Sequence, residues 1–438
     1  MDKPEEAHRG TALTDREREL IETGSLTDGA IRDQHFEFFR ALRKGAPIFY
    51  DAKLGSWLVT RNEDIWAIQS DPVTFSVELG YHDFQARGMQ DEFREILRRD
   101  GGGYFPDAIM SDPPYHTRIR KLMELAFTAH RVKELEPRIR DVVVELLDKV
   151  SARAECDAVR DIAIPLTIRV IVEQLGLDHG IEEKISRWSV AMTAQIGGMQ
   201  SREDMLENAR QICELQNYLI GKMRDREKAP REDMISDIVH AKVHDEHGQT
   251  MTLKFEEAAS LIRAMLIAGN DTTATAISNL FLLLATQPQI VKMLDDAVDD
   301  ERALNRFVEE LLRMEPPTRA LSRATIREVE VNGVTLPKGA HLLLAYGSGN
   351  DDETVFPNPR DFDPTRTNFA KHVTFGGGPH KCIGLALARM EIKVIAREIA
   401  RHFRNIRLTI PAEDITYLPT IATRTIEHLP ITFDRRTG

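Results

Sequence analysis

The chain has 438 residues, of which 42% are hydrophobic and 29% charged, a composition typical of a globular protein with a large core. Its formal net charge of −12, with no concentrated run of Lys and Arg, argues against a nucleic-acid partner. Three scattered cysteines, Cys156, Cys213 and Cys382, do not make a disulfide framework. We therefore expect a cytoplasmic protein with neither a signal peptide nor a membrane anchor.

The N-terminal part of the chain is predicted to be a flexible tail over residues 1–27, followed by a single domain over residues 28–438. A helix over residues 36–42 leads into two short apolar strands, residues 47–50 and 56–60. The few polar residues between these strands predict a hairpin, and therefore the beginning of a small sheet.

A proline pair at residues 113–114 predicts the start of a helix, because proline is favoured in the first helical turn. His116 and Arg120 follow it four residues apart, and thus on one face of that helix. Together they are able to clamp an anion, but a solvated His/Arg face explains them equally well.

The middle of the chain is predicted to be helical, because apolar residues recur at a spacing of three to four. The longest predicted helix, residues 255–286, is apolar on its flanks and polar at its centre. Further helices are expected over residues 92–99, 131–150, 165–175, 180–195 and 202–226.

The polar centre of the long helix reads Gly269-Asn270-Asp271-Thr272. A glycine inside a helix costs about 1 kcal/mol relative to alanine, and a buried unpaired polar group costs about 1–3 kcal/mol. One explanation is that this face meets solvent. The other is functional: Thr272 bonds back to the carbonyl of Ala268, bends the helix and opens a groove beside Gly269.

A helix over residues 305–313 is predicted to end before a proline pair at residues 316–317. Glu310 and Arg313 lie three residues apart on it, which by itself indicates an ordinary surface ion pair. Downstream, an Asn-Gly turn at residues 332–333 joins two predicted strands.

The most informative stretch reads Phe375-Gly-Gly-Gly-Pro-His-Lys-Cys382-Ile-Gly384 and is followed by an amphipathic helix. A helix N-terminus and nearby backbone N–H groups favour the thiolate form of a cysteine, which is the form that binds metals. Buried cysteines are more often inert, the phosphate-binding glycine motifs are not matched, and zinc needs further Cys or His ligands nearby. A metal held by one thiolate remains, and haem iron is its main example.

Four motifs in this chain resemble those of the cytochrome P450 family of haem-thiolate monooxygenases. The spacing of Phe375, Gly378, Cys382 and Gly384 fits the signature of that family. The stretches Asp-Pro-Pro-x-His-x-x-x-Arg from residue 112, Ala-Gly-x-Asp-Thr-Thr from residue 268 and Glu-x-x-Arg from residue 310 occur in the family's order. The resemblance covers the chain from about residue 30 to its end.

This resemblance implies the cytochrome P450 fold, mainly α-helical with a small β-sheet region, and haem b as cofactor. It implies that Cys382 is the metal ligand, and that Asp271 and Thr272 are the catalytic pair that delivers protons. The residues implied to contact haem are His116, Arg120, Arg323, His380, Phe375, Gly378 and Gly384. The pocket would include Ala268, Gly269, Thr318, Arg319 and Ile421, and the structural network Glu310, Arg313 and Arg366.

Two pocket positions leave questions open. Arg319 would pair with a carboxylate substrate, or else turn to solvent or to a haem propionate. Thr425 stands where the family often has glycine, so the shape of that turn is not predicted.

The resemblance implies a monooxygenase that hydroxylates or epoxidises a hydrophobic small molecule, with electrons from a separate ferredoxin system. Two alternatives are a peroxide-driven haem oxygenase and a haem-binding sensor without turnover. We expect a monomer, no membrane contact, and a ferredoxin docking patch made of Lys121, Lys381, Arg389 and Lys393. The sequence does not identify the substrate.

Overall fold

The computed structural model of the chain describes residues 12–84, 89–105, 110–126, 129–197, 200–244 and 248–436. Chain contacts divide it into two compact units, which are described separately. Unit 1 comprises Met1–Phe84, Glu309–Lys381 and Ile421–Arg424, and unit 2 comprises Gln85–Val308, Cys382–Thr420 and Thr425–Gly438. Helices predominate and the sheets are small, which confirms the predicted fold class.

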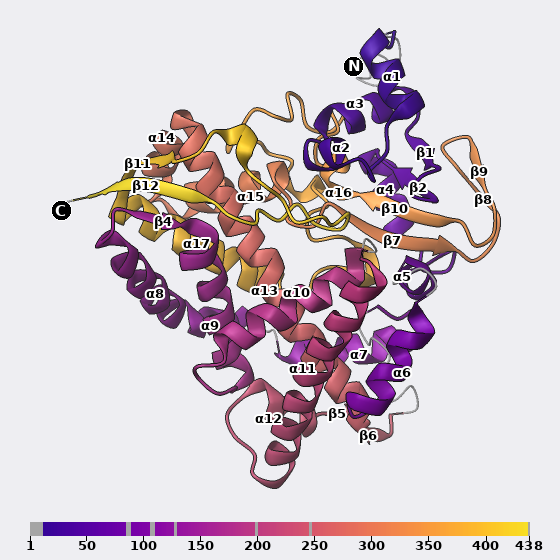
Figure 1. Cartoon of the computed structure of the whole chain (residues 1–438), viewed down its shortest axis with the longest axis vertical. Helices are drawn as coiled ribbons and strands as arrows, with labels where there is room; N and C mark the ends of the chain where they lie inside the picture. The colour runs from indigo at the N-terminus through magenta and orange to yellow at the C-terminus, as the bar shows by residue number, and fades with distance from the viewer. Residues whose placement is uncertain are drawn as a thin grey trace. The chain divides into compact units, whose positions relative to one another are not determined.

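A five-stranded sheet forms the centre of unit 1 (Figure 1). The predicted hairpin is confirmed, and β10 (His341–Ala345) lies parallel to its second strand. Asn332 and Gly333 have φ values of 48° and 75°, as a tight turn of this kind requires. The sheet order is β1 (Ile48–Asp51), β2 (Ser56–Val59), β10 (His341–Ala345), β7 (Ala320–Thr325) and β3 (Phe75–Ser76), with β8 (Val329–Val331) and β9 (Val334–Leu336) as a separate hairpin.

The helices of unit 1 include one inside the predicted tail. Helix α1 (Asp15–Thr23) begins at a capping box between Thr14 and Glu17, and its Leu20 is buried. Residues 1–11 lie outside the described residues, and the division of the chain at residue 27 stays a prediction. The other helices are α2 (Gly29–Asp33), α3 (Phe36–Gly45), α4 (Asn62–Ser70), α5 (Val77–Phe84), α16 (Tyr346–Gly349), η3 (Phe369–Lys371) and η4 (Gly378–His380).

Unit 2 holds most of the helices, and α13 (Phe255–Thr286) has the bounds predicted from its sequence. The other predicted helices are also present, with ends that differ by a few residues. They are α6 (Gln90–Asp100), α7 (Tyr115–Ala126), α8 (Ala129–Ser151), α9 (Ile164–Leu175), α10 (Glu182–Gly197), α11 (Arg202–Lys228) and α17 (Leu385–His402), while α15 (Glu301–Met314) continues into unit 1. Four further helices were not predicted: η2 (Ala158–Ala163), α12 (Met234–Val239), α14 (Pro288–Ala297) and η5 (Ala412–Asp414). Its strands are β4 (Glu155–Asp157), β5 (Lys242–His244), β6 (Thr250–Thr252), β11 (Phe403–Leu408) and β12 (Pro430–Arg435).

Helix α13 lies at the centre of the unit 2 core. Leu261, Ile262 and Leu266 are fully buried in a cluster that also takes in side chains of α7, α9, α10, α11 and α12. Helix α17 also packs against α13 and, on another side, against α8 (Figure 1). This packing buries Asn270 at the polar centre of α13, while Gly269, Asp271 and Thr272 beside it stay partly exposed.

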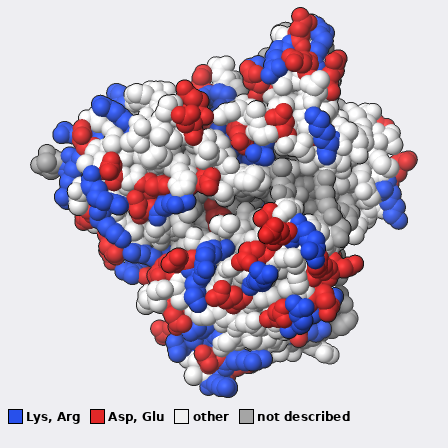
Figure 2. Space-filling view, in the orientation of Figure 1, with Lys and Arg blue, Asp and Glu red and all other residues white. Residues whose placement is uncertain are grey.

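Charges of both signs are interspersed over the described residues of the face shown in Figure 2. Among the described residues, no single helix is long and apolar enough to cross a membrane. Helices α13 and α14 reach the length and apolar composition of a membrane span only when they are taken together, and they are bent by 114° at their junction.

Candidate active site

Cys382 lies just before α17, where the helix N-terminus meets the sulfur. Its Sγ accepts hydrogen bonds from the backbone N–H groups of Gly384 and Leu385, and the guanidinium groups of Arg120 and Arg389 add positive charge nearby. Burial is the larger influence and raises the pKa of the Cys382 thiol, while these four groups oppose the rise. The site therefore supplies the donors that a thiolate needs.

The other two cysteines have no comparable environment. Burial raises the pKa of the Cys156 thiol to about 12, and the carboxylates of Asp161 and Asp157 add to the rise. Burial likewise raises the pKa of Cys213 to about 11. These two thiols stay protonated and act as small apolar side chains.

The centre of α13 has the local geometry expected from its sequence. The Thr272 hydroxyl donates to the carbonyl of Ala268 at 2.8 Å, as predicted. Thr275 bonds back to the carbonyl of Asp271 in the same way, also at 2.8 Å. A Cβ placed on Gly269 would meet its nearest atom, of Ile171, at 4.0 Å, an ordinary van der Waals contact, so this position is not crowded.

Asp271 points toward α10 and accepts a hydrogen bond from the Thr193 hydroxyl. Burial raises the pKa of the Asp271 carboxyl to about 6, and the bond from Thr193 partly offsets that rise. A carboxyl with this pKa exchanges protons readily near neutral pH, which suits a proton relay. The side chains of Asp271 and Thr272 bond to Thr193 and Ala268 respectively, not to each other.

Asp271→Asn should stabilise the protein at neutral pH. The pKa of Asp271 is about 6 in the folded protein, against 3.8 for an unperturbed aspartate. Ionisation of Asp271 therefore penalises the folded state fully above about pH 6 and very little below about pH 4. At about 1.36 kcal/mol per pKa unit, the penalty removed at pH 8 is at most about 3 kcal/mol. Urea unfolding should show a higher free energy of unfolding for Asp271→Asn than for the unmodified protein at pH 8, and this gain should shrink toward pH 5. A gain independent of pH would contradict the raised pKa.

Helix α7 carries the His116 and Arg120 pair. His116 is buried, and burial, together with the charge of Arg120, lowers the pKa of its imidazole, while Asp112 acts in the opposite direction. The imidazole is therefore neutral at pH 7, and it would bind an anion as a hydrogen-bond donor rather than as a cation. The Nε of Arg120 donates to Glu124 at 3.1 Å, one turn further along α7.

In unit 1, Arg323 is buried on β7 and bonds to the hydroxyl of Tyr346, which donates to Gln69 at 3.3 Å. Gln69 and Trp66 of α4 lie directly behind the glycine-rich stretch. A Cβ on Gly377 would come within 2.3 Å of the Trp66 ring. Close packing against α4 is therefore one reason for the glycines.

The remaining signature residues of unit 1 lie around this contact. Gly378 has a φ of 61°, and a Cβ there would come within 2.3 Å of the Gln69 carbonyl oxygen. Phe375 stacks at a tilt against His372 with 6.1 Å between the ring centres, and His380 ends the short helix η4.

Arg319 is 1% exposed, and its guanidinium donates to the backbone carbonyls of Arg32 and Thr423. Thr318 forms a β-bridge with Thr423, and Ile421 beside it is buried. In this arrangement Arg319 fastens the turn over residues 421–424 to the rest of unit 1. Its pairing with a substrate carboxylate stays a prediction.

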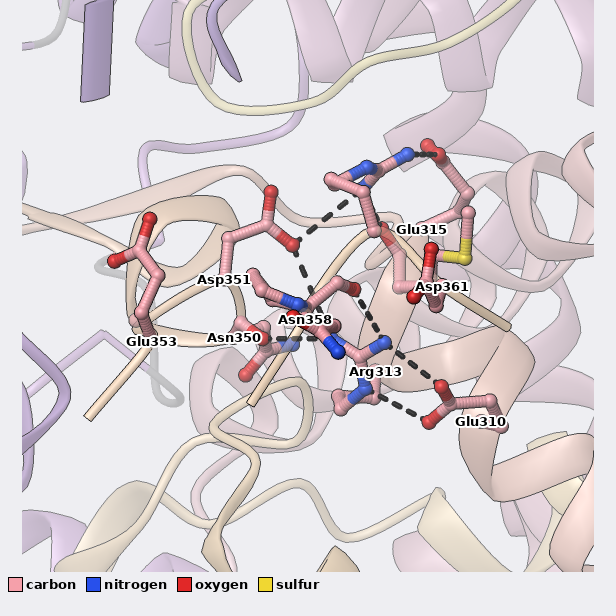
Figure 3. Close-up of polar contacts among 12 residues, drawn as sticks. Glu310, Arg313, Glu315, Asn350, Asp351, Glu353, Asn358 and Asp361 are labelled. Atoms are coloured by element: carbon pink, nitrogen blue, oxygen red, sulfur yellow. Dashed lines mark hydrogen bonds and ion pairs between the residues drawn. The ribbon is translucent and has the colours of Figure 1, made fainter. Parts of the chain in front are cut away.

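Glu310 and Arg313 form a buried ion pair rather than a surface pair, since both side chains are 0% exposed. Arg313 donates to both carboxylate oxygens of Glu310, at 2.7 and 2.8 Å, and to the carbonyl of Asn350 at 2.8 Å (Figure 3). Arg366 adds a third member through its Nε, 3.1 Å from Glu310. The network ties α15 to the loop that precedes the glycine-rich stretch.

Sequence reasoning missed two contacts of α13. Thr193 of α10 was not considered, and it lies 78 positions from Asp271. Thr425, the unexplained departure from the family pattern, places its hydroxyl 3.1 Å from that of Thr275. A single sequence contains no signal that links such distant positions; only the polarity of these residues distinguishes them from their neighbours.

Comparison with known proteins gives a consistent result. The cytochrome P450 family model matches residues 199–415. The chain is 32% identical to 6-deoxyerythronolide B hydroxylase of Saccharopolyspora erythraea, over 91% of this chain and 97% of that protein. It is also 32% identical to mycinamicin IV hydroxylase/epoxidase of Micromonospora griseorubida, over 86% of this chain and 89% of that protein.

Solved structures are similar over nearly the whole chain. Cytochrome P450 CREJ in complex with (4-ethylphenyl) dihydrogen phosphate has a TM-score of 0.82 at 30% identity, covering 91% of this chain and 97% of that one. P450BioI, in complex with hexadec-9Z-enoic acid ligated acyl carrier protein, has a TM-score of 0.81 at 28% identity, covering 94% and 100%.

Proposed function

Because the chain belongs to the cytochrome P450 family of haem-thiolate monooxygenases, we propose that it inserts one oxygen atom from dioxygen into a hydrophobic small molecule. The observation that carries this proposal is the environment of Cys382. Its sulfur receives two backbone N–H groups at the start of α17 and the positive charge of Arg120 and Arg389. Cys156 and Cys213 have no such set of donors.

The residues present fit a haem group. Besides the donors around Cys382, a Cβ on Gly384 would meet no atom within 4 Å, and a Cβ on Gly269 of α13 would meet only Ile171, at 4.0 Å. We propose haem b, with Cys382 as its iron ligand and His116, Arg120, Arg323 and His380 as partners of its propionates. When bound, such a group activates dioxygen for attack on a C–H or C=C bond.

The chain itself supplies proton transfer and enclosure. Thr272 would hold a water beside Gly269, and Asp271, with a pKa near 6, would accept a proton from solvent and pass it toward that water. Ala268, Gly269, Thr318, Arg319 and Ile421 are the proposed pocket positions. The names of the relatives given above refer to different small molecules, so they do not single out one substrate. The proposal is therefore limited to a hydrophobic small molecule.

Turnover with separate electron donors tests the proposed function. The purified protein, NAD(P)H, a ferredoxin and its reductase should consume dioxygen and oxidise a ligand found by a spin-state screen, with one oxygen atom in the product. The same assay with hydrogen peroxide in place of the electron donors tests the peroxide-driven alternative. If the protein binds haem but oxidises none of its ligands, either with the electron donors or with hydrogen peroxide, the sensor alternative would be favoured.

The electron donor is proposed to be a ferredoxin in a reducing cytoplasm, where the three cysteines remain free. The docking patch predicted from the sequence contains Lys121, Lys381, Arg389 and Lys393. Lys393 is the weakest of these candidates, because its side chain is 12% exposed and is paired with Glu301.

Charge reversal at Lys381 and Arg389 should slow electron transfer from an acidic ferredoxin about tenfold or more, since steered association responds strongly to charge. Stopped-flow reduction at low and high salt measures this effect. The difference in reduction rate between the unmodified and the charge-reversed protein should narrow at high salt, because salt screens the charges. An unchanged rate at low salt would place the docking surface elsewhere.

A further inference from the structure

Two hydroxyl groups of α10, one helical turn apart, bond to two consecutive polar residues of α13. Ser189 accepts a hydrogen bond from the Asn270 side-chain amide at 2.9 Å. Thr193 donates to the carboxylate of Asp271. Residues four positions apart lie on the same face of a helix, so α10 presents both hydroxyl groups to two adjacent residues at the centre of α13.

The first contact is a fixed structural bond. Asn270 is 2% exposed, and its amide oxygen accepts from the hydroxyl of Thr167 on α9 at 2.6 Å while its nitrogen donates to Ser189. Both ends of this amide are therefore occupied by neutral groups in the core. This bond sets how α9, α10 and α13 meet, and it remains the same whether or not Asp271 is ionised.

The second contact differs because its acceptor titrates. Burial raises the pKa of Asp271, and the hydroxyl of Thr193 is the single hydrogen-bond donor among the described side chains that counteracts it. No Lys, Arg, His, Asp or Glu of α9, α10, α11 or α17 among the described residues contributes to that pKa. Apart from burial, the pKa of Asp271 therefore depends on one neutral hydroxyl from another helix.

We propose that Thr193 is a positioning residue for proton transfer, whose hydroxyl orients the Asp271 carboxylate and sets how readily it takes up a proton. This inference rests on the proposed monooxygenase function and adds a residue of α10 to its proton path. A hydrogen bond donated to a carboxylate favours its ionised form, so loss of the Thr193 hydroxyl should raise the pKa of Asp271 by about one to two units.

The test compares Thr193→Val, Thr193→Ser and the matched control Ser189→Ala, which removes the neighbouring hydroxyl from the same helix. Infrared difference spectra against Asp271→Asn, recorded as a function of pH on the resting holoenzyme, report protonation of this carboxyl. Thr193→Val should raise its pKa by at least one unit. Thr193→Ser should restore the original value, and Ser189→Ala should leave it in place.

The pH profile of turnover provides a second measurement. The limb of this profile that reports Asp271 has an apparent pKa. In Thr193→Val this apparent pKa should rise by the same number of units as the pKa in the infrared titration. An unchanged infrared pKa in Thr193→Val, or an equal shift in Ser189→Ala, would overturn the role of Thr193. The infrared titration needs no substrate, so this failure is distinct from a failure to oxidise any ligand.

Discussion

Replacing Cys382 with alanine should abolish the thiolate-type band of the reduced carbon monoxide complex and reduce monooxygenase turnover below detection. The sulfur is the proposed iron ligand, and thiolate ligation is what favours O–O cleavage in this class of protein. The backbone N–H groups of Gly384 and Leu385, which meet the sulfur, remain in the variant but have no anion to stabilise. Absorbance spectra and product analysis of the purified variant measure both effects.

Cys156→Ala is the matched control for this substitution. Cys156 is a buried thiol whose pKa is raised to about 12, so its removal changes packing alone. We expect the control to keep the thiolate-type band and its turnover. A Cys382→Ala protein with an unaltered band would show that another residue ligates the iron, and the functional assignment of the whole signature stretch would then be wrong.

Glu310→Gln should lower the free energy of unfolding by about 3–5 kcal/mol, the usual cost of removing one partner from a buried ion pair. Glu310 accepts from Arg313 and Arg366 and from the backbone N–H of Asp363. Its neutral analogue would leave two guanidinium groups in the network without their shared anion. Urea unfolding followed by circular dichroism measures the loss.

Glu301→Gln provides the comparison on the same helix. Glu301 is 56% exposed and pairs with Lys393 and Arg397 at the surface, where ion pairs contribute about 0–1 kcal/mol. The two variants make the same chemical change and differ in burial. Equal effects on unfolding would contradict a bracing role for the Glu310 network.

The sequence was sufficient for several features that depend on local pattern. The bounds of α13 follow from its apolar flanks, and the bond from Thr272 to Ala268 follows from a hydroxyl inside a helix. The turn at Asn332-Gly333 follows from the residues that tolerate a positive φ. In each case the interacting groups lie within a few positions of one another.

Helix α1 shows a local signal that was overlooked. Thr14 and Glu17 form the capping box that begins it, but the surrounding residues are polar and suggested a tail. Its buried residues, Leu20 among them, are too few to produce a clear apolar period. The capping residues were therefore better evidence than hydrophobicity at this end of the chain.

Two features that depend on tertiary contact were not predicted. Arg319 was weighed as a ligand for a substrate carboxylate, whereas the structure gives it the carbonyls of Arg32 and Thr423 as acceptors. Backbone acceptors leave no mark on the sequence, since every residue has a carbonyl. The bond from Thr193 to Asp271 was missed for a related reason: threonine is common in helices, and its partner lies on another one.

The reduced carbon monoxide spectrum of the unmodified protein decides whether Cys382 is the thiolate ligand of the iron. We expect the thiolate-type band, because Cys382 meets two backbone N–H groups and two guanidinium charges that favour a thiolate. A protein that binds haem but shows only the band typical of a neutral ligand would contradict Cys382 as the proximal thiolate, and with it the proposed monooxygenase chemistry.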